Sequence, residues 1–216
     1  MRILVLADIH SDFDSLKKVL GQPKSHDLAV LLGDNTHYGG YSDIEKILGA
    51  MGKQKILALP GNVDTKEVLE TFEKKGISLH GKKKKISGFT FIGFGGGKTG
   101  DGGETNFPEK ETYESLKKLC RGEEKIILCT HQPPFGTKID LMHNGKHIGS
   151  EAVKKIIEEF RPIVHFCGHC HEGTGEEKIG KTLCINAGPV KEGNAVVIEI
   201  NEKNNGIKIE RIKVEL

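Results

Sequence analysis

Five short, mostly apolar stretches recur along the chain, and each one ends at polar residues. They cover residues 2–8, 27–34, 55–62, 125–131 and 161–171. Such runs are typical of strands buried on both faces of a parallel sheet. Segments with apolar residues at helical spacing alternate with them, at 15–20, 42–51, 65–76, 108–121 and 150–160. This alternation predicts an α/β architecture with a parallel sheet at its centre.

The remaining segments predict further strands. Residues 77–97 alternate around turns at Gly81 and Gly88, so "KKKK" at 82–85 is interpreted as part of a solvated hairpin. The apolar and polar positions after residue 180 alternate as in antiparallel strands. Ser42 or Asp43 is expected to cap the second helix. Because no repeat or linker interrupts these patterns, we expect one domain over residues 1–216 with two sheets.

The polar residues that end the apolar runs are the main functional signal. They are Asp8, His10, Asp34, Asn62, His131, His169 and His171. In open α/β sheets, the loops at the carboxyl ends of the strands form the ligand-binding crevice. We therefore expect these side chains in one region, where all could donate nitrogen or oxygen to a metal. Seven ligands are too many for one ion with an open position, but they suit two ions that share a carboxylate.

Composition narrows the function classes. The chain of 216 residues has 32 Lys plus Arg, 30 Asp plus Glu and a net charge of +2, which gives no reason to expect nucleic acid or an anionic membrane as a partner. The apolar run at the N-terminus is too short for a signal peptide or a spanning helix, so we expect a cytoplasmic protein. Five widely spaced cysteines do not suggest a disulfide framework.

The motifs that carry the seven residues resemble those of the calcineurin-like metallophosphoesterases, in the order of that family and across most of the chain. They are D-x-H (Asp8, His10), G-D (Asp34), G-N (Asn62), a strand-ending His131 and G-H-x-H (His169, His171). The resemblance implies a two-sheet β-sandwich flanked by helices, with a dinuclear site at the sheet edge. It also implies one ion on Asp8, His10 and His171, another on Asn62, His131 and His169, and Asp34 as the bridge.

The same resemblance implies a phosphoesterase, in which a metal-bound hydroxide attacks phosphorus. The expected substrate is a small phosphate ester, with a phosphodiester ahead of a phosphomonoester. Imidazole-rich ligation favours Mn²⁺ first, with Fe, Ni²⁺ and Zn²⁺ also compatible, over an all-oxygen Mg²⁺ site. A family member kept as a non-catalytic protein-binding scaffold is the alternative from another class. The oligomeric state stays open.

Cys167 and Cys170 form a C-x-x-C that allows a third hypothesis, a thiol oxidoreductase. A redox C-x-x-C opens a helix, whereas residues 171–177 contain two glycines and no apolar face. A zinc knuckle would need a second cysteine pair at finger spacing. Lys98-Thr99 does not complete a phosphate-binding loop either, because Ile92 stands where that motif needs glycine.

Val63 is the main departure from the family pattern. The resemblance implies a His directly after the Asn of G-N, where it protonates or stabilises the leaving oxygen, and Val63 can do neither. Either the substrate has a good leaving group or another residue supplies the proton. The candidates for that catalytic acid are His37, His143 and His147, with Lys146 as a phosphate contact.

Overall fold

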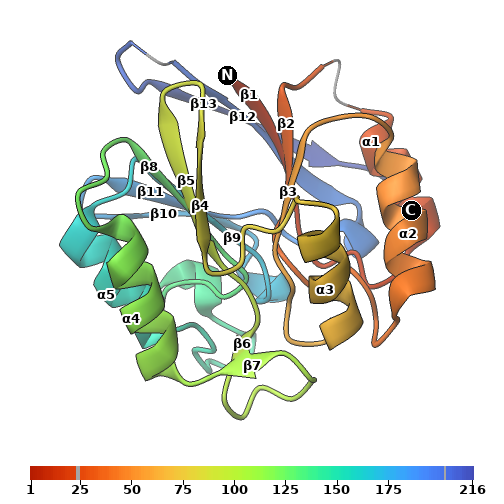
Figure 1. Ribbon diagram of the computed structural model, residues 1–216, viewed down its shortest axis with the longest axis horizontal. Helices are drawn as coiled ribbons and strands as arrows, with labels where there is room; N and C mark the ends of the chain where they lie inside the picture. Colours follow the sequence, from red (N-terminus) through yellow and green to blue (C-terminus); the bar gives the residue numbers. More distant parts are fainter. Residues whose placement is uncertain (23–24, 202) are drawn as a thin grey trace.

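Two main sheets pack face to face in the computed structural model, which describes residues 1–22, 25–201 and 203–216 (Figure 1). The first sheet has the order β13-β12-β1-β2-β3. Its strands are β1 Arg2–Leu6, β2 Leu28–Leu31, β3 Ile56–Ala58, β12 Asn194–Ile200 and β13 Ile207–Lys213. The first three are parallel, and β12 runs antiparallel to both β1 and β13.

The second sheet has the order β10-β11-β9-β8-β5-β4. Its strands are β4 Lys82–Ile86, β5 Phe89–Phe94, β8 Ile126–Thr130, β9 Val164–Cys167, β10 Gly175–Ile179 and β11 Thr182–Asn186. The neighbours β5, β8, β9 and β11 are parallel, while β4 and β10 are antiparallel edge strands. A short parallel pair, β6 Gly97–Lys98 and β7 Asn106–Phe107, lies apart from both sheets (Figure 1).

Helices cover the outer face of each sheet, as Figure 1 shows. They are α1 Phe13–Leu20, α2 Tyr41–Met51, α3 Lys66–Lys74, α4 Glu109–Cys120 and α5 Glu151–Phe160. The first three pack on the first sheet, and α4 and α5 pack on the second. This arrangement confirms the predicted two-sheet sandwich flanked by helices.

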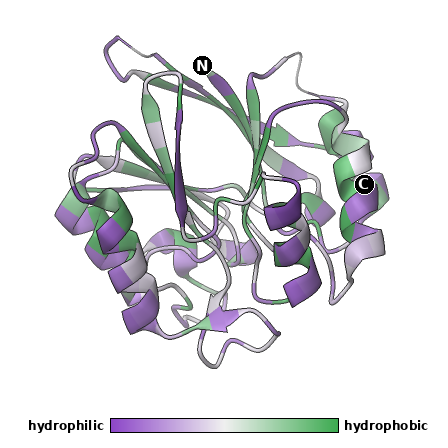
Figure 2. Cartoon of the chain, viewed as in Figure 1, coloured by the Kyte–Doolittle hydropathy of each residue, from purple (hydrophilic) through white to green (hydrophobic). Residues whose placement is uncertain are grey.

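Alternation along the strands explains the layers. In β1, Ile3 and Val5 face the core between the sheets, whereas Leu4 and Leu6 face the helices, and all four are buried. A strand covered on both faces needs apolar residues at every position, which is why these strands read as continuous apolar runs. Figure 2 shows hydrophobic residues gathered on the inner strands, whereas the helices carry both hydrophobic and hydrophilic residues.

One local expectation, the cap of the second helix, was wrong. The second helix begins at Tyr41, and neither Ser42 nor Asp43 caps it. The Glu67 carboxylate accepts the hydrogen bond from the Tyr41 backbone N–H instead, at 3.1 Å, so a residue distant in sequence satisfies that donor. The antiparallel pairing expected in the C-terminal part is confirmed, because β11 pairs antiparallel with β10 and β12 pairs antiparallel with β13. In addition, β11 pairs in parallel with β9, because it lies between β9 and the edge strand β10.

The "KKKK" segment agrees with its interpretation as a solvated hairpin. It lies in β4, which pairs only with β5 at the edge of the second sheet, and three of its four lysines are exposed. Within residues 1–22, 25–201 and 203–216, no helix has the length and apolarity needed to cross a membrane.

Candidate metal centre

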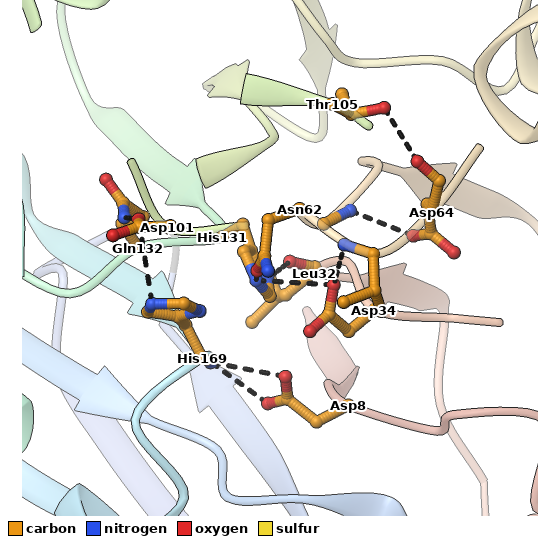
Figure 3. Close-up of polar contacts among 12 residues, drawn as sticks. Asp8, Leu32, Asp34, Asn62, Asp64, Asp101, Thr105, His131, Gln132 and His169 are labelled. Atoms are coloured by element: carbon orange, nitrogen blue, oxygen red, sulfur yellow. Dashed lines mark hydrogen bonds and ion pairs between the residues drawn. The ribbon is translucent and has the colours of Figure 1, made fainter. Parts of the chain in front are cut away.

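Loops at the carboxyl ends of β1, β2, β3, β8 and β9 bring the predicted residues together. They form two groups of three residues, and within each group the candidate ligand atoms all lie within 4.8 Å of one another. The first group is Asp8, His10 and His171, and the second is Asp34, His131 and His169. We refer to them as the first and second ligand groups. Asn62 adjoins the second group, with its Oδ1 3.0 Å from Nε2 of His131 (Figure 3).

Asp34 lies between the two groups. Its Oδ2 is 3.7 Å from Nε2 of His10, and its Oδ1 is 3.6 Å from Nε2 of His131. The Val63 backbone N–H donates to Oδ1 at 3.0 Å and orients the carboxylate. A carboxylate with one oxygen toward each group has the arrangement that two ions sharing a ligand require.

The backbone is strained at several of these residues. Asp8, His10, Asp34 and His169 have φ values of 54°, 49°, 48° and 66°, in the left-handed region that residues other than glycine rarely adopt. Each such residue costs of the order of 1–3 kcal/mol, and strain of this kind clusters at functional sites. The fold therefore holds these side chains in place at a cost to stability.

Gly61, in the G-N motif, is required by close approach. A Cβ at this position would lie 2.1 Å from both the backbone nitrogen and Oδ1 of Asp34. No side chain fits there, so the loop after β3 can reach the Asp34 carboxylate only with glycine before Asn62.

His131 has the orientation that a metal ligand needs, and His10 and His169 have the required protonation. Nδ1 of His131 lies 3.0 Å from the Leu32 carbonyl oxygen, to which it can donate, and this leaves Nε2 for an ion (Figure 3). Burial lowers the pKa of His10 to about 4 and that of His169 to about 3, so both rings are neutral at pH 7 and keep a free lone pair.

Two further observations test whether the residues fit metal ions. Both ring nitrogens of His10 are buried without a hydrogen-bond partner among the described residues, which is costly unless another group satisfies one of them. Burial also raises the pKa of Asp34 to about 7, because nearby positive charge does not offset the loss of solvation. A bound cation would correct both features, so the donor set fits.

The comparisons with known proteins agree with this geometry. The family model for calcineurin-like phosphoesterases matches residues 1–173. The chain belongs to this family. It is 35% identical over 196 residues to the uncharacterised protein MJ1162 of Methanocaldococcus jannaschii, and the match covers 88% of each chain.

Solved structures show the same fold for this phosphoesterase family member. The structure of TT1561 from Thermus thermophilus matches with a TM-score of 0.72 and 18% identity, over 97% of each chain. The purple acid phosphatase PPD1 from yellow lupin matches with a TM-score of 0.57 and 10% identity, over 96% of this chain and 52% of the phosphatase. At these identities the likeness concerns the fold alone.

Asp64 is a residue of the site that the sequence patterns did not predict. It is fully buried, and its carboxylate accepts hydrogen bonds from the backbone and side chains of Asn35 and Thr36 and from the Gly61 N–H, at 2.8–3.1 Å. It thus ties the loop after β2, which carries Asp34, to the loop after β3, which carries Asn62. An acid two positions after Asn62 was its only sequence signal.

The candidates for the proton donor occupy different environments. His37 is exposed beside the first group, with its ring centroid 5.6 Å from that of His10. His143 lines a cavity of about 530 Å³ that His171 also borders. Nδ1 of His147 instead lies 2.8 Å from Oδ1 of Asp140, a contact that anchors its own loop. Lys146 is exposed on the same loop.

The cysteines have none of the properties of a redox pair. All five are free and buried. Burial raises the pKa of the Cys170 thiol to about 11 and that of Cys167 well above its usual value, whereas a redox cysteine needs a lowered pKa. Cys170 precedes only a three-residue 3-10 turn, His171–Gly173. Cys167 packs in the apolar cluster between the second sheet and its helices.

Proposed function

We propose that this protein is a hydrolase of phosphate esters that uses a dinuclear metal centre. The first ion would be held by Asp8, His10 and His171, the second by Asn62, His131 and His169, with Asp34 bridging. The observation that carries the proposal is the position of Asp34, with one carboxylate oxygen near each group. When bound, two such ions supply Lewis acidity and an activated water for phosphoryl transfer.

The protein's own residues would prepare the site. The backbone N–H of Val63 and the buried Asp64 network hold Asp34 and Asn62 in place. The neutral imidazoles of His10 and His169 supply nitrogen ligands without adding positive charge that would repel cations. Burial lowers the pKa of His10 and the positive charge of Lys191 lowers it further, so Lys191 is placed to attract an anionic phosphate.

A phosphodiester is the favoured substrate class, ahead of a monoester, and Mn²⁺ is the favoured metal. Glu172 and Glu192 border the cavity beside His171, facing one lysine, Lys213. A diester carries one negative charge where a monoester carries two near neutral pH, so the acidic border disfavours the monoester more. The imidazole-rich donor set suits Mn²⁺, Fe, Ni²⁺ or Zn²⁺.

The first experiment measures metal content and hydrolysis together. Protein stripped with a chelator is reloaded with Mn²⁺, Fe²⁺, Ni²⁺ or Zn²⁺ and assayed on bis(p-nitrophenyl) phosphate and p-nitrophenyl phosphate. We expect two ions per chain and faster hydrolysis of the diester. Two bound ions without hydrolysis of a wider ester panel would favour the scaffold hypothesis, for which Val63 is the supporting observation. Failure to bind ions would refute the centre itself.

Val63 leads to a prediction on leaving groups. Its backbone orients Asp34, but its apolar side chain cannot protonate a departing oxygen. The rate should therefore depend steeply on leaving-group pKa, fast for nitrophenolate and slow for alkoxides. Val63→His should help alkyl esters more than aryl esters, by up to ~10²-fold if the imidazole reaches the oxygen.

The measurement is a plot of log kcat/KM against leaving-group pKa for both proteins. Val63→Leu serves as a control, because it changes side-chain volume without adding a proton donor. A shallow slope already present with Val63 would mean that another residue supplies the proton. His37→Ala and His143→Ala would then identify it by steepening that slope.

A further inference from the structure

A glycine-rich segment, residues 95–105, crosses over the second ligand group. The Gly96 N–H donates to the Pro60 carbonyl oxygen at 2.7 Å, and the Thr105 N–H donates to the Asn62 carbonyl oxygen at 3.2 Å. In return, Nδ2 of Asn62 donates to the Gly102 carbonyl oxygen at 3.3 Å. Hydrogen bonds therefore join the segment to the G-N loop at Pro60 and at Asn62.

Glycine makes this approach feasible at position 103. A Cβ there would lie 2.0 Å from the Asn62 carbonyl oxygen, and the φ value of 87° also favours glycine. At the other end of the segment, Nζ of Lys98 donates to the carbonyl oxygens of Ile148 and Gly149, at 2.8 Å each. The segment is anchored at both ends.

Asp101 is the acidic residue that this segment presents to the second group. Its Oδ2 lies 3.9 Å from Nε2 of His169, as Figure 3 shows. The same oxygen accepts hydrogen bonds from the Lys98 N–H at 2.9 Å and from Nε2 of Gln132, the residue after His131. Only 14% of the Asp101 side chain is exposed. The carboxylate is therefore held in place beside the imidazole.

We propose that Asp101 is a positioning residue for the second ion. We assign its carboxylate, 3.9 Å from Nε2 of His169, as the partner of that nitrogen, so that Nδ1 is the ring nitrogen left for the ion. The Gly102 carbonyl engages the Nδ2 side of the Asn62 amide and leaves Oδ1 for the same ion. One short segment thus selects the ligand atom of two residues, one from each sheet. The inference rests on the dinuclear centre proposed above and extends it.

General physical chemistry supports this role. A ligating histidine almost always gives its other ring N–H to a carboxylate, carbonyl or water, which sets the tautomer and makes the ring a better donor. His131 has such a partner in the Leu32 carbonyl at 3.0 Å, and Asp101 is the carboxylate that faces Nε2 of His169, at 3.9 Å. Losing an outer partner of this kind typically lowers metal affinity by ~10–100-fold.

Asp101→Asn tests the proposal, with Glu104→Gln as the matched control. Glu104 is exposed in the same segment, so its variant removes one negative charge without touching His169. Metal titration followed by calorimetry should show that Asp101→Asn weakens one of the two ions by ~10–100-fold and leaves the other unchanged. Glu104→Gln should match the wild type for both ions. Hydrolysis is not a readout, so the result is independent of whether the protein cleaves any ester tested.

A second measurement needs no metal. In metal-free wild-type protein, ¹⁵N NMR of the ring of His169 should show the proton on Nε2, and Asp101→Ala, which removes the acceptor oxygen, should redistribute it toward Nδ1. A residue that merely stabilised the segment would not move this tautomer. A proton on Nδ1 in the wild type overturns the proposal, as does equal weakening of both ions or of neither. The unfolding temperature measured in the presence of a chelator should be the same for Asp101→Asn and Glu104→Gln. If Asp101→Asn unfolds at a lower temperature, the NMR spectrum of the wild-type His169 ring decides the question.

Discussion

Asp34→Asn is expected to abolish most phosphoesterase activity and to lower the occupancy of both ions. The substitution removes the charge of a carboxylate that lies 3.7 Å from His10 in the first group and 3.6 Å from His131 in the second. Because a bridging ligand serves both ions, the loss should exceed the ~10–100-fold that outer-shell partners typically contribute. Substitution of a residue that binds only one of the ions should not lower the metal occupancy of both sites to the same extent.

Asparagine is the right replacement at this position. Residue 34 has a φ value of 48°, and Asn tolerates the left-handed region nearly as well as Asp. The amide oxygen can also still accept the hydrogen bond from the Val63 N–H. The fold should therefore survive while the charge is lost.

The measurement combines metal analysis of the purified protein with rates on a chromogenic phosphodiester. Asp14→Asn, at an exposed position in α1, is the control and should keep both ions and the wild-type rate. An Asp34→Asn protein that keeps two ions and its rate would show that Asp34 is not the bridge.

His171→Ala is expected to cost more than ~10²-fold in rate, whereas Cys167→Ser combined with Cys170→Ser should change it only a few-fold. His171 belongs to the first ligand group, so its loss removes a proposed metal ligand. The two thiols are buried, have raised pKa values and are not proposed as ligands. A serine at 167 can keep the hydrogen bond that Sγ now gives to the Ile185 carbonyl oxygen.

Alanine suits residue 171 better than residue 169, where the φ value of 66° would add backbone strain to the loss of the imidazole. Rates and metal content are measured for His171→Ala and for the cysteine double variant, with circular dichroism to confirm folding. Sensitivity to the cysteines and indifference to His171 would revive the thiol oxidoreductase hypothesis. A folded double variant with two ions and normal rates excludes it.

Local sequence patterns determined the layers and the candidate ligands. A strand buried on both faces must be apolar at nearly every position, and a polar residue that ends such a run stands at the edge of the sheet. That reasoning was sufficient to select Asp8, Asp34 and Asn62 as neighbours although they lie on three separate strands. It was sufficient because parallel neighbouring strands end at the same edge.

Only the tertiary structure decided how these residues are held. Glu67 satisfies the first N–H of α2, Asp64 joins two loops from inside the core, and Asp101 reaches His169 from a segment 68 positions earlier in the sequence. In the sequence, each is one acid among 30 Asp and Glu residues. A hydrogen bond between distant segments depends on which backbone groups the folded chain leaves without partners, and no local pattern of apolar and polar residues records that.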